Sequence, residues 1–386
     1  MRAGALPSIP PTPPSGRHYL CAIAACCLLA TAAVAAPGGP SSWPQFRGRA
    51  DLAGVATGVA LPDRLRPLWT YESGDAVESS AAIAGGAVFV GTRAGLLALD
   101  LATGKPRWTY ATGSLGIGES SPAVASGLVY VGDLDGTVHA VAAADGRKVW
   151  TYKTANEVKS SPVIAGGRVL IGSYDGHLYG LDAATGALAW KVATEGPVHG
   201  TPAVEGGIAY VGGCDQRFRG VRIADGKVVT EADSGAYTGA SPALSAGRAF
   251  YGTFENEVLA VDVGTGRIAW RYKPADRQFP FYSSAAVSGG TVVVGGRDKR
   301  VHAIDAATGK PAWTFSTQAR IDSSPAIAGG RVYIGSNDGR LYVLDLATGR
   351  KVSEWSAGAP ISASPAIAGG RLVIGAHDGR IYCLGG

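Results

Sequence analysis

Cysteine, methionine and histidine are scarce in this sequence, which narrows the kinds of site it can hold. The 386 residues include one Met, five Cys and six His. Three of the Cys precede residue 36, which leaves Cys214 and Cys383 in distant copies of the repeat described below. We therefore expect no disulfide between them. The His residues do not cluster with Cys at the spacing of a zinc site, so we assign no metal ligands.

The sequence also lacks a marked excess of positive or negative charge. The chain carries 35 basic and 30 acidic residues, a formal net charge of +5, and no block of like charges occurs along it. Two of the basic residues, Arg2 and Arg17, lie in the N-terminal segment that we expect to be removed. Such a balance argues against nucleic acid and against an anionic membrane surface as partners.

Long apolar runs are absent except near the N-terminus, where the chain reads "YLCAIAACCLLATAAVAA". We predict a signal peptide over residues 1–35, because cleavage after Ala36 would leave Pro37 as the first mature residue. Ile23–Cys26 resembles a lipoprotein box, which keeps a lipid anchor as an alternative, although the apolar run continues past that point. No later stretch is long enough to cross a bilayer, so we expect a soluble periplasmic or secreted protein.

Glycine and an internal repeat dominate the rest of the chain. There are 57 Gly, and Val, Ile, Tyr and Trp recur at short intervals, which favours strands joined by tight turns. The element Ser-Ser-Pro, or a variant of it, returns every 40 to 43 residues. Its copies begin at Ser79, Ser120, Ser160, Gly200, Ala240, Ser283, Ser323 and Ala363.

One copy, residues 323–350, shows how the unit folds. Gly329-Gly330 and Asp338-Gly339 supply the positive φ angles that two-residue hairpins require, so each copy is predicted to be a four-stranded antiparallel meander. The third strand, "RLYVLDL", is apolar at nearly every position, which indicates that both of its faces are covered. Neighbouring copies must therefore stack on each other, and twisted sheets of this period close into a ring of blades.

The two ends of the repeat region predict how the ring closes. The last copy stops at "IYCLGG" after its third strand, while "PLWTY" at residues 67–71 supplies a fourth strand that no other three precede. Pairing these ends completes an eight-bladed β-propeller over residues 67–386 and removes the exposed sheet edges. We expect residues 36–66, which include "WPQFRG", to form a leader packed as a strap on the ring.

A recurrent tryptophan identifies a family. "ALDLATGKPRW", "AIDAATGKPAW" and "AVDVGTGRIAW" share the form Ala-x-Asp-x-x-Thr-Gly-Lys/Arg-x-x-Trp. This form resembles the tryptophan-docking motif of pyrroloquinoline-quinone (PQQ)-like propeller repeats, whose indole packs between adjacent blades. The resemblance implies that role for Trp69, Trp108, Trp150, Trp190, Trp270 and Trp313.

Two copies depart from the docking motif. Thr230 stands where Trp is expected, so we predict one seam between blades that lacks an aromatic and is looser. Ser353 takes the same position in another copy, with Trp355 two residues later on the same strand face.

The residues just before each Ser-Ser-Pro element should converge at the mouth of the central channel, and unlike the rest of the repeat they vary. This makes them candidates for binding, although they could equally line a solvated channel and pair with one another, Glu119 with Lys159 for instance. In ring order they are Glu78, Glu119, Lys159, His199, Gly239, Tyr282, Asp322 and Ser362.

Turn residues on the same face form a second candidate surface. Exposed aromatic and Arg side chains are the types that anchor protein partners, although the same residues could be ordinary loop surface. The candidates are Arg93, Asp133, Tyr174, Phe254, Arg297, Asn337 and His377.

The family resemblance also implies a catalytic alternative. Quinoprotein dehydrogenases of this repeat type hold PQQ in the channel with Ca²⁺, and Glu78, Asp322 and Asn337 could be imagined as ligands. The chain after residue 35 has no adjacent Cys pair, no Trp at the channel and no long insertions to enclose a substrate. We therefore assign no catalytic residues and expect no cofactor, with a PQQ- and Ca²⁺-dependent oxidoreductase as the alternative.

Among exported propellers of this repeat type, the sequence is similar to the BamB outer-membrane assembly factors. The resemblance implies a non-catalytic periplasmic scaffold that binds an envelope protein, and we expect a monomer. A ligand-sensing or carbohydrate-binding propeller is the remaining alternative.

Overall fold

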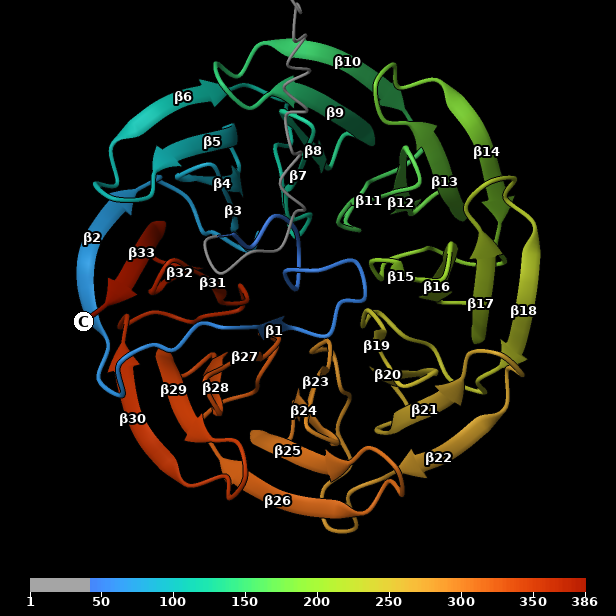
Figure 1. Ribbon diagram of the computed structural model, residues 1–386, viewed down its shortest axis with the longest axis vertical. Coiled ribbons are helices and arrows are strands. Elements are labelled where there is room, and N and C mark those ends of the chain that lie inside the picture. Colours follow the sequence, from blue (N-terminus) through green and yellow to red (C-terminus); the bar gives the residue numbers. More distant parts are fainter. Residues whose placement is uncertain (1–41) are drawn as a thin grey trace, which may run out of the picture. The chain divides into compact units, whose positions relative to one another are not determined.

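The structure, a computed structural model, describes residues 42–386, so the predicted signal peptide lies outside the described residues. Eight antiparallel sheets, each with four strands of a blade, form a ring around a central axis (Figure 1). This confirms the predicted all-β, eight-bladed propeller. We number the blades from β3–β6 (blade 1) to β31–β33 with β2 (blade 8).

Each blade contributes one strand to each of four concentric layers, and Figure 1 shows the first strands nearest the axis. The innermost strands are β3 (Ala82–Ala84), β7 (Ala123–Ala125), β11 (Val163–Ala165), β15 (Ala203–Glu205), β19 (Ala243–Ser245), β23 (Ala286–Ser288), β27 (Ala326–Ala328) and β31 (Ala366–Ala368). The second strands are β4 (Ala87–Thr92), β8 (Leu128–Gly132), β12 (Arg168–Ser173), β16 (Ile208–Gly212), β20 (Arg248–Gly252), β24 (Thr291–Gly295), β28 (Arg331–Gly335) and β32 (Arg371–Gly375).

The third and fourth layers lie toward the rim. The third strands are β5 (Gly95–Asp100), β9 (Thr137–Ala142), β13 (His177–Asp182), β17 (Arg217–Arg222), β21 (Val258–Asp262), β25 (Arg300–Asp305), β29 (Arg340–Asp345) and β33 (Arg380–Gly385). The outer strands are β6 (Pro106–Tyr110), β10 (Lys148–Lys153), β14 (Leu188–Ala193), β18 (Val228–Asp233), β22 (Ile268–Tyr272), β26 (Pro311–Ser316), β30 (Lys351–Ser356) and β2 (Arg66–Glu72).

Blade 7 shows why the repeat folds this way. Gly329 and Gly330 have φ angles of 54° and 72°, and they turn the chain from β27 into β28. Gly339, with φ 84°, does the same between β28 and β29. The middle residues of β29 are buried on both faces, as its continuous apolar pattern predicts. Stacking between blades therefore supplies the core.

The ring is closed by the two ends of the repeat region. β2 pairs antiparallel with β33, with Trp69 opposite Cys383 and Glu72 opposite Arg380. The observed strand, Arg66–Glu72, extends one residue beyond the predicted 67–71 at each end. Blade 8 thus contains strands from both ends of the described chain, which leaves no unpaired blade edge at the closure.

The docking tryptophans join successive blades. Below each indole lies the glycine of the next blade's Thr-Gly or Asp-Gly turn; a Cβ at Gly226, for example, would lie 2.7 Å from Trp190. Each indole nitrogen also donates a hydrogen bond of 2.8–3.1 Å to a backbone carbonyl of the next blade. The tryptophans are Trp69, Trp108, Trp150, Trp190, Trp270 and Trp313.

The seam between blades 4 and 5, where Thr230 replaces Trp, is built differently. The Thr230 hydroxyl donates to the Val263 carbonyl at 3.2 Å, in the manner of the missing indole nitrogen. The rings of Tyr210, Phe218 and Tyr251 form a continuous stack across the seam, with centroids 5.9 and 5.6 Å apart. The seam therefore lacks the docking indole, as expected, but rings from elsewhere in blades 4 and 5 supply aromatic contacts across it.

The other departure lies in blade 7. The Ser353 hydroxyl donates to the Asp63 carbonyl, so a segment before β2 covers the vacated position. Trp355 instead packs its ring 4.7 Å from Tyr382 of blade 8, edge to face. An aromatic contact therefore joins these two blades as well.

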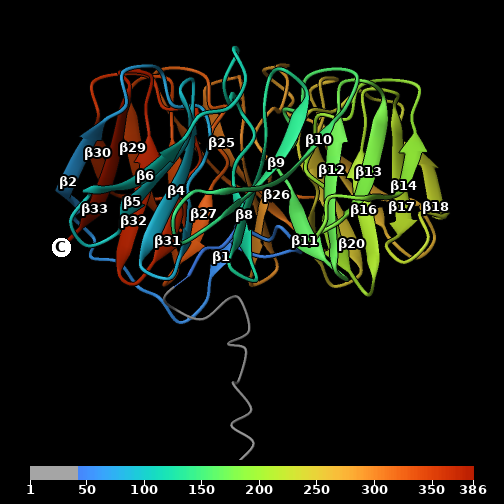
Figure 2. The ribbon, with the colours of Figure 1, turned by 90° about the horizontal axis from the view of Figure 1, so that it is seen from above.

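Residues 42–65, which we call the strap, cross one face of the ring (Figure 1), and Figure 2 shows β1 (Val55–Ala56) at that face. β1 adds a parallel fifth strand to blade 7 by pairing with β27. Innermost-strand amides donate to strap carbonyls at 2.7–2.9 Å, at Val124, Val204, Leu244, Val287 and Ile327. Because these are main-chain bonds, the side chains of the strap give little indication of where the strap lies on the ring.

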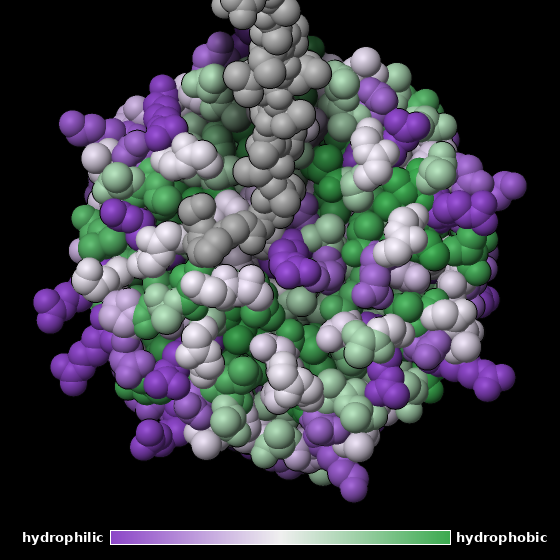
Figure 3. All heavy atoms as spheres, viewed as in Figure 1, coloured by the Kyte–Doolittle hydropathy of each residue, from purple (hydrophilic) through white to green (hydrophobic). Residues whose placement is uncertain are grey.

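On the strap face, hydrophilic residues project from the rim, hydrophobic residues lie between the rim and the centre, and a further hydrophilic group lies near the centre (Figure 3). Cys214 and Cys383 are both free thiols, which confirms the expected absence of a disulfide between them. Within residues 42–386 no helix has the length and apolar character needed to span a membrane.

Candidate binding site in the central channel

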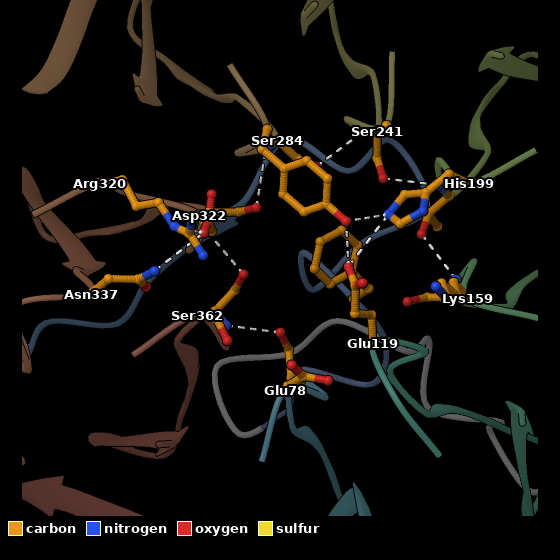
Figure 4. Close-up of a pocket in the computed structure, with 18 of the residues that line it drawn as sticks. Glu78, Glu119, Lys159, His199, Ser241, Ser284, Arg320, Asp322, Asn337 and Ser362 are labelled. Carbon is orange, nitrogen blue, oxygen red and sulfur yellow. Dashed lines mark hydrogen bonds and ion pairs between the residues drawn. The ribbon is translucent and has the colours of Figure 1, made fainter. Parts of the chain in front are cut away.

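The eight residues that precede the Ser-Ser-Pro elements do converge, as predicted. All of them line one cavity of about 280 Å³ on the axis of the ring, and Figure 4 shows several of their side chains directed toward one another. We call the end of the cavity where they lie the mouth. The strap bonds the innermost strands farther along each blade, so it closes the opposite end, which we call the floor.

Tyr282 crosses the mouth from blade 6 to the opposite blade 2. Its hydroxyl donates to Glu119 Oε2 at 2.6 Å and lies 2.9 Å from His199 Nε2 (Figure 4). His199 Nε2 is also 3.4 Å from Glu119 Oε2, and its Nδ1 is 2.6 Å from the Tyr174 hydroxyl. These four side chains form a network that divides the mouth into a half with blades 3–5 and a half with blades 7, 8 and 1.

The network changes the acidity of its members. Burial by itself raises the pKa of Glu119, but the hydrogen bond and charge of His199, the Tyr282 hydrogen bond and the Lys159 charge together lower it to about 2. Burial, reinforced by the negative charge of Glu119, raises the pKa of Tyr282 far above its ordinary value. Glu119 is therefore ionised and Tyr282 neutral at any physiological pH.

The Tyr282 ring is held on both sides. Phe254 stacks on it at 6.1 Å between centroids, and the Arg297 guanidinium lies 4.7 Å from its centroid. Gly239 makes room for this arrangement, since a Cβ there would lie 3.2–3.3 Å from Phe254, His199 and Tyr282. Packed rings thus line part of the half of the mouth with blades 3–5.

Asp322 is the centre of a second cluster at the mouth. Arg297 Nε donates to one carboxylate oxygen at 2.7 Å, and Arg320 Nε lies 2.9 Å from the other. The Asn337 amide also donates to Asp322, at 3.3 Å. Asn337 Oδ1 is buried and has no hydrogen-bond partner among residues 42–386. The Asp322 oxygens are therefore occupied by cationic and amide donors.

The remaining mouth residues are arranged less tightly. Lys159 forms an ion pair of 3.1 Å with Glu157 and lies over the Tyr174 ring, so the direct pairing with Glu119 offered above is wrong. Ser362 Oγ is 2.7 Å from His377 Nε2. Glu78 makes no hydrogen bond or ion pair within the described part of the chain.

The turn residues proposed as a partner surface divide into four groups. Arg297, Asn337 and His377 line the cavity, while Tyr174 and Phe254 contact its wall through His199 and Tyr282. Arg93 is exposed and donates to the Leu115 carbonyl at 3.3 Å. Asp133 is wrongly placed on that surface, because its side chain is buried and bonds His139 Nε2 at 2.8 Å.

A ring of hydroxyl groups below the mouth was missed by sequence reasoning. The second residue of every Ser-Ser-Pro element accepts a hydrogen bond from the amide of the equivalent residue in the preceding blade, at 2.9–3.1 Å. The signal was available, because this position bears a hydroxyl in all eight copies. The hydroxyl ring, all of it lining the cavity, comprises Ser80, Ser121, Ser161, Thr201, Ser241, Ser284, Ser324 and Ser364.

The floor is supplied by the strap. Phe46 lines the cavity, and the next residue, Arg47, is only 1% exposed. Its guanidinium donates to the carbonyls of Pro325 and Ala285, each of which directly follows a member of the hydroxyl ring. Burial lowers the pKa of Arg47 to about 9, so the group stays charged at neutral pH. No carboxylate within residues 42–386 pairs with it.

The mouth residues do not fit the calcium and quinone site that the repeat type implies. No group of three or more His, Cys, Asp or Glu in the described chain could hold a metal ion. Asp322, one of the three imagined ligands, already accepts from two arginines, whose positive charges oppose a bound cation. No Trp lines the cavity over residues 42–386, so an indole platform for a flat cofactor is missing.

Beside the mouth, three aromatic side chains from neighbouring loops form what we call the aromatic patch: Tyr237, Phe254 and Phe279. Tyr237 and Phe279 are 44% and 50% exposed. The Phe254 amide donates to the Tyr237 carbonyl at 2.9 Å, and the loop of Phe279 is held by the Arg297 amide, which donates to Pro280 at 3.1 Å. The patch therefore lies on loops anchored to the turns of blades 5 and 6.

Solved structures of proteins with different activities share this fold. A europium-containing methanol dehydrogenase is 14% identical with a TM-score of 0.77, covering 90% of this chain and 98% of its own. Quinohemoprotein alcohol dehydrogenase from Comamonas testosteroni is 16% identical with a TM-score of 0.76, covering 91% and 81%. BamB from Moraxella catarrhalis is 18% identical with a TM-score of 0.70, covering 84% and 98%.

Sequence comparison gives a family. No curated protein matches the chain. A family model described as outer membrane protein assembly factor BamB matches residues 59–162, 135–279 and 254–385, which together span the propeller. The chain therefore belongs to this family of PQQ-like propellers.

Proposed function

We propose that the protein is a non-catalytic scaffold that binds an envelope protein through the mouth face of the propeller. The observation that carries the proposal is the aromatic patch, in which Tyr237 and Phe279 are about half exposed on loops held by main-chain hydrogen bonds. Rigid, exposed aromatic side chains are the residues that most often dominate the binding energy of protein interfaces.

The chemistry of the channel supports the same role. The pKa of Glu119 is lowered and that of Tyr282 is raised, which leaves neither group able to exchange a proton near neutral pH. Asp322 is held by Arg297 and Arg320 in fixed ion pairs. Neither Glu119 nor Tyr282 is therefore adjusted to act as a general acid or base near neutral pH, which supports a binding role for the channel mouth.

The proposed setting is the periplasm. It is supported by the expected signal peptide over residues 1–35 and by the family, whose description names the assembly of outer-membrane proteins. A propeller whose two ends pair inside one blade is also suited to presenting one face as a rigid platform.

The test replaces the patch and compares it with an equally exposed apolar pair elsewhere. Tyr237→Ser with Phe279→Ser removes the patch, and Val228→Ser with Val229→Ser on the outer strand β18 is the matched control, at 43% and 41% exposure. Each protein is used to capture partners from a solubilised envelope fraction, and thermal unfolding verifies that both variants fold.

We expect the patch variant to lose a partner that the wild type and the control retain. Removing one hot-spot residue costs at least about 2 kcal/mol, which is roughly thirtyfold in affinity, so removing two should weaken binding by more than that. Equal capture by all three proteins would contradict the proposal.

A further inference from the structure

Two charged side chains near the channel lack a partner of opposite charge within residues 42–386: Glu78 lines the cavity at its mouth, and Arg47 is buried behind the floor. Glu78 at the mouth has no hydrogen bond or ion pair with any described residue. Among the described residues, the Arg47 guanidinium donates to the carbonyls of Pro325 and Ala285 and to no carboxylate. The other charged groups of the cavity wall are paired, Glu119 with His199, Lys159 with Glu157, and both arginines with Asp322.

Between these ends lie hydrogen-bond donors without acceptors. Each hydroxyl of the ring accepts one amide hydrogen, so its own O–H is left to donate toward the cavity that it lines. Apart from Ser121, which lies 3.5 Å from the Glu119 carbonyl, no ring hydroxyl donates to another group within residues 42–386. Together with the charge of Arg47 below, these donors create a site for an anionic group.

The mouth presents the opposite chemistry. The Glu78 carboxylate and the buried, unpartnered Asn337 Oδ1 are both acceptors. Both belong to the half of the mouth with blades 7, 8 and 1, whereas packed rings line part of the other half. An ammonium group with several N–H donors would satisfy the Glu78 carboxylate, which lines the cavity.

We propose that the channel binds a short zwitterion of the dipeptide class, with its carboxylate on the hydroxyl ring and its ammonium group at Glu78. Glu78 and Ser80 are two residues apart, so their Cα atoms are at most about 7 Å apart, close to the span of an extended dipeptide. The cavity of about 280 Å³ is of the size that takes a small ligand.

This site is separate from the aromatic patch, so it goes beyond the scaffold role and does not depend on it. Binding is measured by isothermal titration calorimetry on the full chain with three probes: diglycine, N-acetyl-diglycine and diglycine amide. The second probe lacks the ammonium charge and the third lacks the carboxylate. We expect diglycine to bind at least about tenfold more tightly than either, because each loses a charge-assisted contact.

Variants test each end separately. Glu78→Gln, which breaks no existing contact, should weaken diglycine binding about tenfold and abolish the preference over N-acetyl-diglycine. Ser80→Ala, which removes the ring hydroxyl two residues after Glu78, should weaken diglycine but not its amide. Ser173→Ala is the control, because Ser173 is a buried hydroxyl outside the cavity wall and its loss should leave binding unchanged.

Several results would overturn the proposal. These are absence of diglycine binding to the wild type, equal affinity for the three probes, or wild-type affinity in the Glu78→Gln protein. If Ser80→Ala and Ser173→Ala weaken binding equally while both melt at the same temperature, the hydroxyl ring has no specific part in it.

Discussion

Replacing the glycine below a docking indole is predicted to lower the stability of the fold by more than the strain of its backbone conformation alone. Gly226, with φ 72°, lies below Trp190, and an added Cβ would meet the indole at 2.7 Å. Gly247 has nearly the same φ, 74°, but an added Cβ would meet nothing within 4 Å. Gly226→Ala and Gly247→Ala therefore share the backbone strain and differ only in the displaced indole.

The expected magnitudes separate the two variants. A left-handed residue with a side chain costs about 1–2 kcal/mol in both proteins. Displacing the indole adds about 1–3 kcal/mol of overpacking to Gly226→Ala, and the 2.8 Å bond from Trp190 to the Ile223 carbonyl adds about 1 kcal/mol if it breaks. Urea unfolding should therefore show Gly226→Ala to be less stable than Gly247→Ala by at least about 1 kcal/mol. Equal midpoints and slopes would refute this account of the seams.

Three further predictions concern charge and ligands. Burial by itself raises the pKa of Asp133, but the hydrogen bond and charge of His139 together with backbone hydrogen bonds from Thr137 and Gly113 lower it overall. This carboxylate therefore stabilises the fold above about pH 4 and does so less as the pH falls. Asp133→Asn should flatten the fall in stability at acid pH, and parallel stability curves for the two proteins would contradict this. Tyr282→Phe removes a hydrogen bond to the Glu119 carboxylate, so the pKa of Glu119, followed by carbon NMR, should rise above about 2. An unchanged pKa of Glu119 would count against the network. Adding Ca²⁺ with PQQ should leave the melting temperature unchanged, because Asp322 is already paired with two arginines. Tight binding would overturn that conclusion, since a ligand at a hundredfold excess over its dissociation constant stabilises the folded protein by about 2.7 kcal/mol.

The fold could be predicted almost completely because residues within each repeat specify its turns and the burial of its strands. Gly329-Gly330 and Asp338-Gly339 specify hairpins through their φ angles, and the apolar third strand requires stacking. The pairing of β2 with β33 followed from counting strands at the two ends. The stack of Phe218 on Tyr251 beside Thr230 was missed because an aromatic elsewhere in the blade, outside the motif, fills the seam.

The site was predictable in outline only. Position in the repeat placed Glu78 to Ser362 around one mouth, since equivalent residues of a ring meet at the axis. The contact from Tyr282 to Glu119 depends on the width of the channel, and sequence spacing gives no such distance. Phe46 and Arg47 reach the floor through main-chain bonds of the strap, which no side-chain pattern reveals.

Site-specific photo-crosslinking in cells tests the central claim most directly. A photoreactive residue at Phe279, on the mouth face, is compared with one at Val228, on the outer strand of blade 4. The account predicts a discrete protein adduct from position 279 and none from position 228. Adducts from both positions alike, or none from position 279, would contradict a partner bound at the mouth face.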